Sequence, residues 1–147
     1  MAVKIDNRNI NNKPGTGRAA TSVVAGGDVF KASYKNARVE IFNGTMKELV
    51  SEVKQRGEKF LKSPEEGLLN SYKESVKLFL KKLKEEFLSL KEEFGAKKDG
   101  EQKVYQTVNT AESEVSALTR EALTENKAIE LLASLDDIRG LVLDIIG

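Results

Sequence analysis

The fold is determined by the stretch from Ser63 to Phe94, which reads SPEEGLLNSYKESVKLFLKKLKEEFLSLKEEF. Its apolar residues recur at steps of three and four, a spacing that places them on one face of an α-helix: Leu69, Tyr72, Val76, Phe79, Leu83, Phe87, Leu90 and Phe94. Ser63, Pro64 and Glu66 match a helix start, because they supply a capping hydroxyl, a first-turn proline and the glutamate of a capping box. The stretch therefore predicts one amphipathic helix about 45 Å long.

Two further helices with the same periodicity flank this one. The helix before it, over residues 41–62, has one apolar face: Phe42, Met46, Leu49, Val53, Gly57 and Phe60. The helix after it begins near Glu101, beyond the polar loop Gly95–Gly100, and uses Val104, Val108, Ala111, Val115, Leu118 and Ala122. Because short connections favour antiparallel neighbours, we predict an all-α fold, an antiparallel up-and-down helical bundle of three long helices.

The last helical region has a shift in its apolar frame after Ala122. Its later apolar positions are Ala128, Leu131, Leu135, Ile138, Val142 and Ile145. One helix from Glu101 to Ile146 would overrun its neighbour and leave this apolar face uncovered. Either the chain breaks between Thr124 and Ser134 and folds back as a fourth helix, or the N-terminal tail or a second subunit covers the face. A weak capping box at Ser134 favours the fourth helix.

The first 36 residues differ from the rest of the chain. They contain the turn-prone stretch Pro14–Gly17 and no sustained helical period. Six basic and two acidic residues give them a net charge of +4, which leaves −3 for residues 37–147. We predict a basic, irregular N-terminal tail over residues 1–36 and a helical bundle domain over residues 37–147. The apolar residues of the tail that could dock on the body are Val29, Phe30 and Tyr34.

The composition excludes several kinds of active site. The chain has no cysteine, histidine or tryptophan, so thiolate zinc sites, cysteine nucleophiles, histidine triads and the histidine ligands of di-iron bundles are all ruled out. A magnesium site built from carboxylates alone would use Glu85, Glu92 or Glu112, which occupy positions typical of solvent-facing glutamates. Tyr72 and Tyr105 are expected to pack with a wet hydroxyl. We therefore predict no enzymatic activity, no cofactor and no metal.

A lysine ridge runs along one flank of the central helix. At 100° per residue its members fall within an arc of about 80°: Lys73, Lys77, Lys81, Lys84 and Lys91. Such a ridge fits the phosphates of a nucleic acid or another anionic ligand. It equally fits a bundle helix whose flanking charges pair with neighbouring helices. The same helix carries seven glutamates, which favours the second interpretation.

The leading functional hypothesis is protein–protein interaction or self-association, the latter giving a homo-oligomer. The candidate partner-binding residues are those of the last apolar face: Leu131, Leu135, Ile138, Gly140, Val142 and Ile145. Gly57 and Gly140 lie inside helical patterns, where glycine costs roughly 1 kcal/mol relative to alanine. Each therefore indicates close helix packing, or else a partner-binding or hinge position. The N-terminus has no apolar block of secretory or membrane length, so we expect a cytoplasmic protein with no membrane contact.

The chain resembles the YaaR-like family of small bacterial proteins. The resemblance rests on Leu69–Lys81, on the ending Ile138–Asp144, and on four positions of the first helix: Leu49, Val53, Gly57 and Leu61. It extends from about Val39 to the C-terminus, and the tail has no counterpart in it. The resemblance implies an all-helical cytosolic bacterial protein without an established activity, and it supplies no catalytic residue. Charged residues make up 32% of the chain, and such a high fraction is also typical of hyperthermophile proteins.

Overall fold

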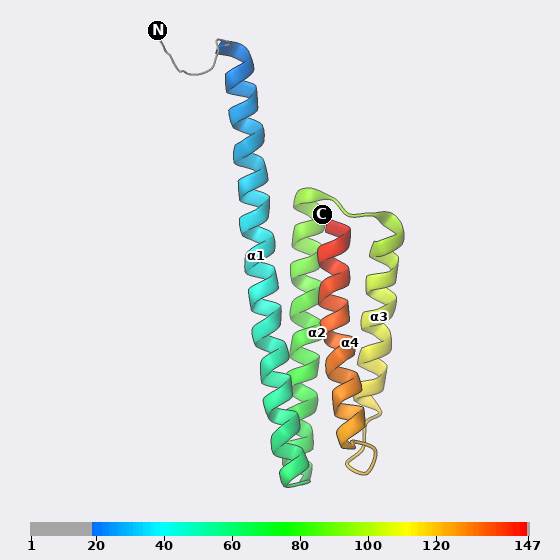
Figure 1. Ribbon diagram of the computed structural model, residues 1–147. Helices are drawn as coiled ribbons and strands as arrows, with labels where there is room; N and C mark the ends of the chain where they lie inside the picture. The colour runs from blue at the N-terminus through cyan, green and yellow to red at the C-terminus, as the bar shows by residue number, and fades with distance from the viewer. Residues whose placement is uncertain (1–18, 147) are drawn as a thin grey trace. The chain divides into compact units, whose positions relative to one another are not determined.

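The computed structural model describes the backbone of residues 19–146 and the side chains of residues 29–146. The described residues form four helices: α1 (Ala19–Lys62), α2 (Glu66–Phe94), α3 (Lys98–Ser116) and α4 (Glu125–Ile146). The chain divides between Ala37 and Arg38 into two compact units. In the second unit, residues 38–62 of α1 form a bundle with α2, α3 and α4, and each helix runs antiparallel to the one before it (Figure 1). This confirms the predicted all-α bundle, in its four-helix form.

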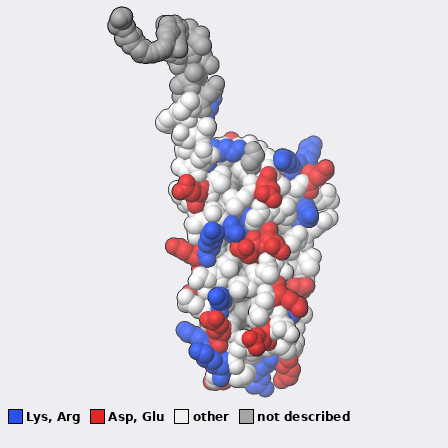
Figure 2. Space-filling model, in the orientation of Figure 1, with Lys and Arg blue, Asp and Glu red and all other residues white. Residues whose placement is uncertain are grey.

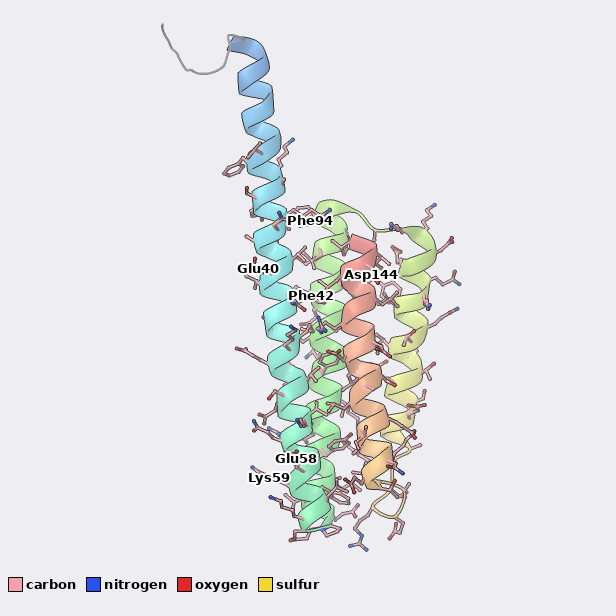
Figure 3. All side chains as sticks on the ribbon, viewed as in Figure 1. Glu40, Phe42, Glu58, Lys59, Phe94 and Asp144 are labelled. Carbon is pink, nitrogen blue, oxygen red and sulfur yellow. The ribbon has the colours of Figure 1, made fainter. Side chains whose placement is uncertain are left out.

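The bundle core is made of the apolar faces that the periodicity predicts. Phe42, Met46, Val53 and Phe60 are buried in α1, and all eight predicted positions of α2 are buried except Phe94, which is half-buried. Phe42 points from α1 toward the other helices, whereas Glu40 points away from them (Figure 3).

Polar contacts place α1 between α2 and α4. Arg56 of α1 donates hydrogen bonds to the carbonyl and hydroxyl oxygens of Ser71 in α2, both at 3.1 Å. Arg139 of α4 donates to the side chain of Asn43 in α1. These hydrogen bonds connect the two sides of α1 to α2 and α4, while the apolar face of α1 packs in the core.

The first helix begins earlier than the sequence pattern predicts. Residues 19–36, expected to be an irregular tail, belong to α1, so the prediction of a tail is wrong for this range. The first unit contributes no residue to the buried core among its described side chains. Periodicity detects a helix through its buried face, and the pattern therefore starts only where α1 contributes to the core. Residues 1–18 lie outside the described part of the chain.

The start of α2 also differs from the prediction. Its N-cap residue is Glu65, without a capping hydrogen bond from its side chain. The Ser63 hydroxyl bonds to the Glu65 carboxylate instead of a helical N–H, so the predicted capping box does not form. The other end follows expectation: Gly95 has a φ of 81°, and its N–H donates to the carbonyl of Lys91. A positive φ is the conformation for which glycine is preferred at a helix end.

The third helical region is split, and it breaks earlier than predicted. Helix α3 ends at Ser116 and α4 begins at Glu125, whereas the predicted break lies between Thr124 and Ser134. Ser134 is inside α4. The actual cap is Thr124, whose hydroxyl accepts a hydrogen bond from the Lys127 N–H at 3.3 Å. Two leucines of the connection are buried, which fixes it to the core: Leu118 and Leu123.

Candidate functional site

A groove lies between α1 and α4 and extends over one residue of α2. We call it the α1–α4 groove, and its volume is about 260 Å³. Its apolar lining comes from three helices: Val53, Gly57, Leu61, Tyr72, Ala128 and Leu132. Ile129, which is 58% exposed, also lines it. Three charged residues complete the lining: Lys54, Glu58 and Glu125. Glu58 lies near the C-terminal end of α1 (Figure 3).

The Tyr72 ring occupies the space that a side chain at position 57 would need. A Cβ atom on Gly57 would lie 3.1 Å from Cε1 and 3.5 Å from Cδ1 of Tyr72. Gly57 therefore allows α1 and the ring to approach closely, which confirms the packing interpretation at this position. Because Cε1 is the nearer ring carbon, the hydroxyl half of the ring is the part that lies against Gly57 of α1.

The Tyr72 hydroxyl is buried and has no hydrogen-bond partner within the described part of the chain. The residue is only 1% exposed, so the expectation of a wet hydroxyl is wrong for Tyr72. Burial raises the pKa of this hydroxyl to about 12, because the phenolate would lose its hydration. At neutral pH the group is therefore a protonated hydrogen-bond donor without an acceptor.

The raised pKa of Tyr72 predicts a loss of stability in alkaline solution. Unfolded tyrosine releases its proton near pH 10, whereas folded Tyr72 keeps its proton until about pH 12. The contribution of Tyr72 is thus fully present below pH 10 and is lost as pH rises through about 12. We expect urea unfolding followed by circular dichroism to show a steeper decline over this range for the wild type than for Tyr72→Phe. Parallel declines would contradict the prediction.

The sequence patterns do not predict the α1–α4 groove. Gly57 and Ala128 are both small residues on apolar faces, and both line the groove. Ile129 lies beside the buried face of α4 as an exposed apolar residue. These signals become informative only once α1 and α4 are known to be neighbours.

Two members of the lysine ridge pair with α3. Lys84 forms an ion pair with Glu112 at 3.4 Å, and Lys91 forms one with Glu101 at 3.4 Å. The other three show no ion pair among the described residues: Lys73, Lys77 and Lys81. The structure therefore supports pairing with a neighbouring helix for part of the ridge.

Lys91 also contacts an aromatic residue of α3. Its ammonium donates a hydrogen bond to the Tyr105 hydroxyl at 3.3 Å, and this bond raises the pKa of Lys91. The Tyr105 ring meets Phe87 edge-on, with 5.5 Å between ring centroids. Tyr105 thus joins the core to the lysine ridge and serves packing, as expected.

Charges of both signs alternate over the face of the molecule in Figure 2. Blue and red side chains are interspersed there without a continuous basic area. A nucleic-acid surface usually needs a local excess of positive charge. This face therefore gives no support to the anion-binding alternative.

The predicted partner-binding face of α4 is part of the core. Five of its six residues are buried, none more than 6% exposed: Leu131, Leu135, Ile138, Val142 and Ile145. The prediction is wrong here because the chain folds back between α3 and α4, so the bundle itself covers the face. At Gly140 an added Cβ would meet no atom within 4 Å, so close helix packing does not explain this glycine.

Among the described residues, the two most exposed large apolar side chains belong to the first unit of the chain, although Ile41, Leu78 and Ile129 of the second unit are also more than half exposed. Phe30 is 72% exposed, Val29 66% and Tyr34 45%. They are the residues that the sequence singled out within the tail, and they lie on α1.

The described residues provide neither a cluster of metal ligands nor a helix that could span a membrane. No group of three or more acidic, histidine or cysteine side chains within residues 19–146 could hold a metal ion. Among the described helices, none combines the length and the apolar character needed to cross a membrane.

Comparison with known proteins places the chain in a family. Neither the curated proteins nor the solved structures include a match to it. One family model, described as "Protein of unknown function (DUF327)", matches residues 4–146. This confirms the resemblance to the YaaR-like family and extends it over the N-terminal region, which the sequence patterns had left unmatched. The chain belongs to the DUF327 family of proteins of unknown function.

Proposed function

We propose that this protein is not an enzyme and acts through protein–protein contacts, with a second copy of the chain as its partner. The observation that carries the proposal is the exposed apolar face of α1 within the first unit. The absence of histidine and cysteine from the sequence supports a non-catalytic role. The face of α4 is no longer a basis for it, because the bundle covers that face.

The apolar face of α1 follows the spacing of helix-pairing surfaces. Phe30, Tyr34 and Ala37 are separated by four and three residues, which places them within an arc of about 60°. All three are exposed. Fully burying one phenylalanine side chain contributes about 1.5–3 kcal/mol. A partner that covers this face would therefore gain substantially from Phe30 alone.

Charge makes a second copy a suitable partner. Lys31 and Lys35 flank the apolar face, and residues 1–37 carry a net charge of +4. Residues 38–147 carry a net charge of −3. Opposite charges on two surfaces steer them together and favour their correct pairing. The basic first 37 residues of one copy thus suit the acidic body of another.

Light scattering tests the proposal, with a control variant that introduces the same charge elsewhere on the helix. We expect the wild type to scatter as a particle heavier than the 16.2 kDa monomer, and Phe30→Glu to scatter as a monomer, because it places a carboxylate on the apolar face. Asn36→Glu is the matched control, since position 36 is exposed and about 120° away around the helix. Circular dichroism should show equal helix content for all three. A wild type that stays monomeric at every concentration would contradict self-association.

A further inference from the structure

Tyr72, which lines the α1–α4 groove, carries a hydroxyl donor that the described part of the protein does not satisfy. A buried hydroxyl without a partner costs about 1–3 kcal/mol, and native proteins rarely leave such a group unpaired. The Tyr72 hydroxyl is in this position within the described residues. An acceptor that enters the groove from outside would remove the cost.

The chemistry of the groove defines the acceptor. The hydroxyl stays protonated far above neutral pH, so its partner must offer a lone pair. The charged lining residues lie on exposed positions of their helices: Lys54, Glu58 and Glu125. A carboxylate buried against a neutral phenol would lack a paired charge and would be costly. The complementary atom is therefore a neutral carbonyl or hydroxyl oxygen.

The size and walls of the groove define the rest of the ligand. A volume of about 260 Å³ is slightly below the range of about 300–1,000 Å³ typical of drug-sized ligands. Apolar side chains of a partner protein, such as leucine or phenylalanine, would fill the space but carry no acceptor. A small apolar molecule with one oxygen satisfies both the walls and the hydroxyl.

Entry of such a molecule requires the groove to widen. The hydroxyl has almost no exposed surface, so lining side chains must move aside before an acceptor reaches it. Leu61 and Leu132 are only partly buried, and Ile129 is largely exposed. These three are the large apolar lining residues that are not fully buried, so they are the ones that we expect to move.

We propose that the α1–α4 groove binds a small, neutral, mostly apolar molecule whose carbonyl or hydroxyl oxygen accepts a hydrogen bond from the Tyr72 hydroxyl. This site lies in the second unit, and its lining includes none of the residues Phe30, Tyr34 and Ala37 of the self-association face on α1.

Amide chemical shifts in a titration of the full chain with two matched probes test the proposal. Acetophenone carries a carbonyl oxygen, and α-methylstyrene has the same shape with a methylene group in its place. We expect both to shift amides of the groove. Because a neutral hydrogen bond adds about 0.5–1.5 kcal/mol, the wild type should bind acetophenone roughly threefold to tenfold more tightly. Tyr72→Phe removes only the hydroxyl and would leave the acetophenone oxygen buried without a donor, so it should lose or reverse the preference for acetophenone.

The controls separate the hydroxyl from general effects. Tyr105→Phe removes a hydroxyl that bonds to Lys91 away from the groove, and it should keep the preference for acetophenone. Tyr72→Phe should unfold at no lower urea concentration than the wild type, because the removed hydroxyl has no partner. The proposal is overturned if neither probe shifts groove amides, if the shifts centre elsewhere, or if Tyr72→Phe retains the preference.

Discussion

Leu135→Ala is expected to lower the free energy of unfolding by about 2–5 kcal/mol, the range for a leucine truncated inside a well-packed core. Leu135 is 0% exposed and lies within the cluster that joins the four helices. Its removal leaves a cavity, since neighbours such as Leu131 and Ile138 belong to the same helix and relax only in part. Urea unfolding followed by circular dichroism measures the change.

Ile129→Ala is the matched control for Leu135→Ala. Both positions lie on α4, but Ile129 is 58% exposed, so its truncation should cost under about 1 kcal/mol. The pair also separates a core role from an interface role. If Leu135→Ala changed the particle mass in light scattering while the protomer kept its stability, the face of α4 would be an interface.

The parts of the fold that sequence reasoning anticipated are those fixed by local periodicity. All seven predicted apolar positions of α2 from Leu69 to Leu90 are buried in the core, because a continuous apolar stripe on a long helix is buried as a unit. Gly95 ends this helix as expected, since its positive φ suits glycine. These features depend on residues close together in the chain.

The parts that it missed depend on residues far apart in the chain. The start of α1 at Ala19 has no buried stripe to reveal it. The sequence predicts the break between Thr124 and Ser134, with a weak capping box at Ser134, whereas Thr124 provides the cap, because the local pattern does not show where α4 packs. The groove at Tyr72 forms where three helices meet, and its unpaired hydroxyl is a property of the packed bundle.

Gly100→Ala is expected to lower the free energy of unfolding by about 1–3 kcal/mol, the usual cost of overpacking. Gly100 is in the first turn of α3, and a Cβ there would lie 2.2 Å from Cγ2 and 3.0 Å from Cβ of Ile145. Ile145 is only 6% exposed, and its carbonyl accepts a hydrogen bond from the Lys97 N–H at 3.3 Å. This hydrogen bond joins the start of α3 to the end of α4. The two helices therefore cannot easily move apart to make room for the added methyl group.

Gly140→Ala should have the opposite effect and is the matched control. Gly140 lies within α4, and an added Cβ would meet no atom within 4 Å. Alanine should therefore stabilise the protein by about 0.4–1 kcal/mol, because it restricts the unfolded chain and favours the helix. The two variants change the same atoms in the same direction, so only their surroundings can give them opposite signs in urea unfolding. Stabilisation by both would mean that α3 and α4 do not meet closely at Ile145.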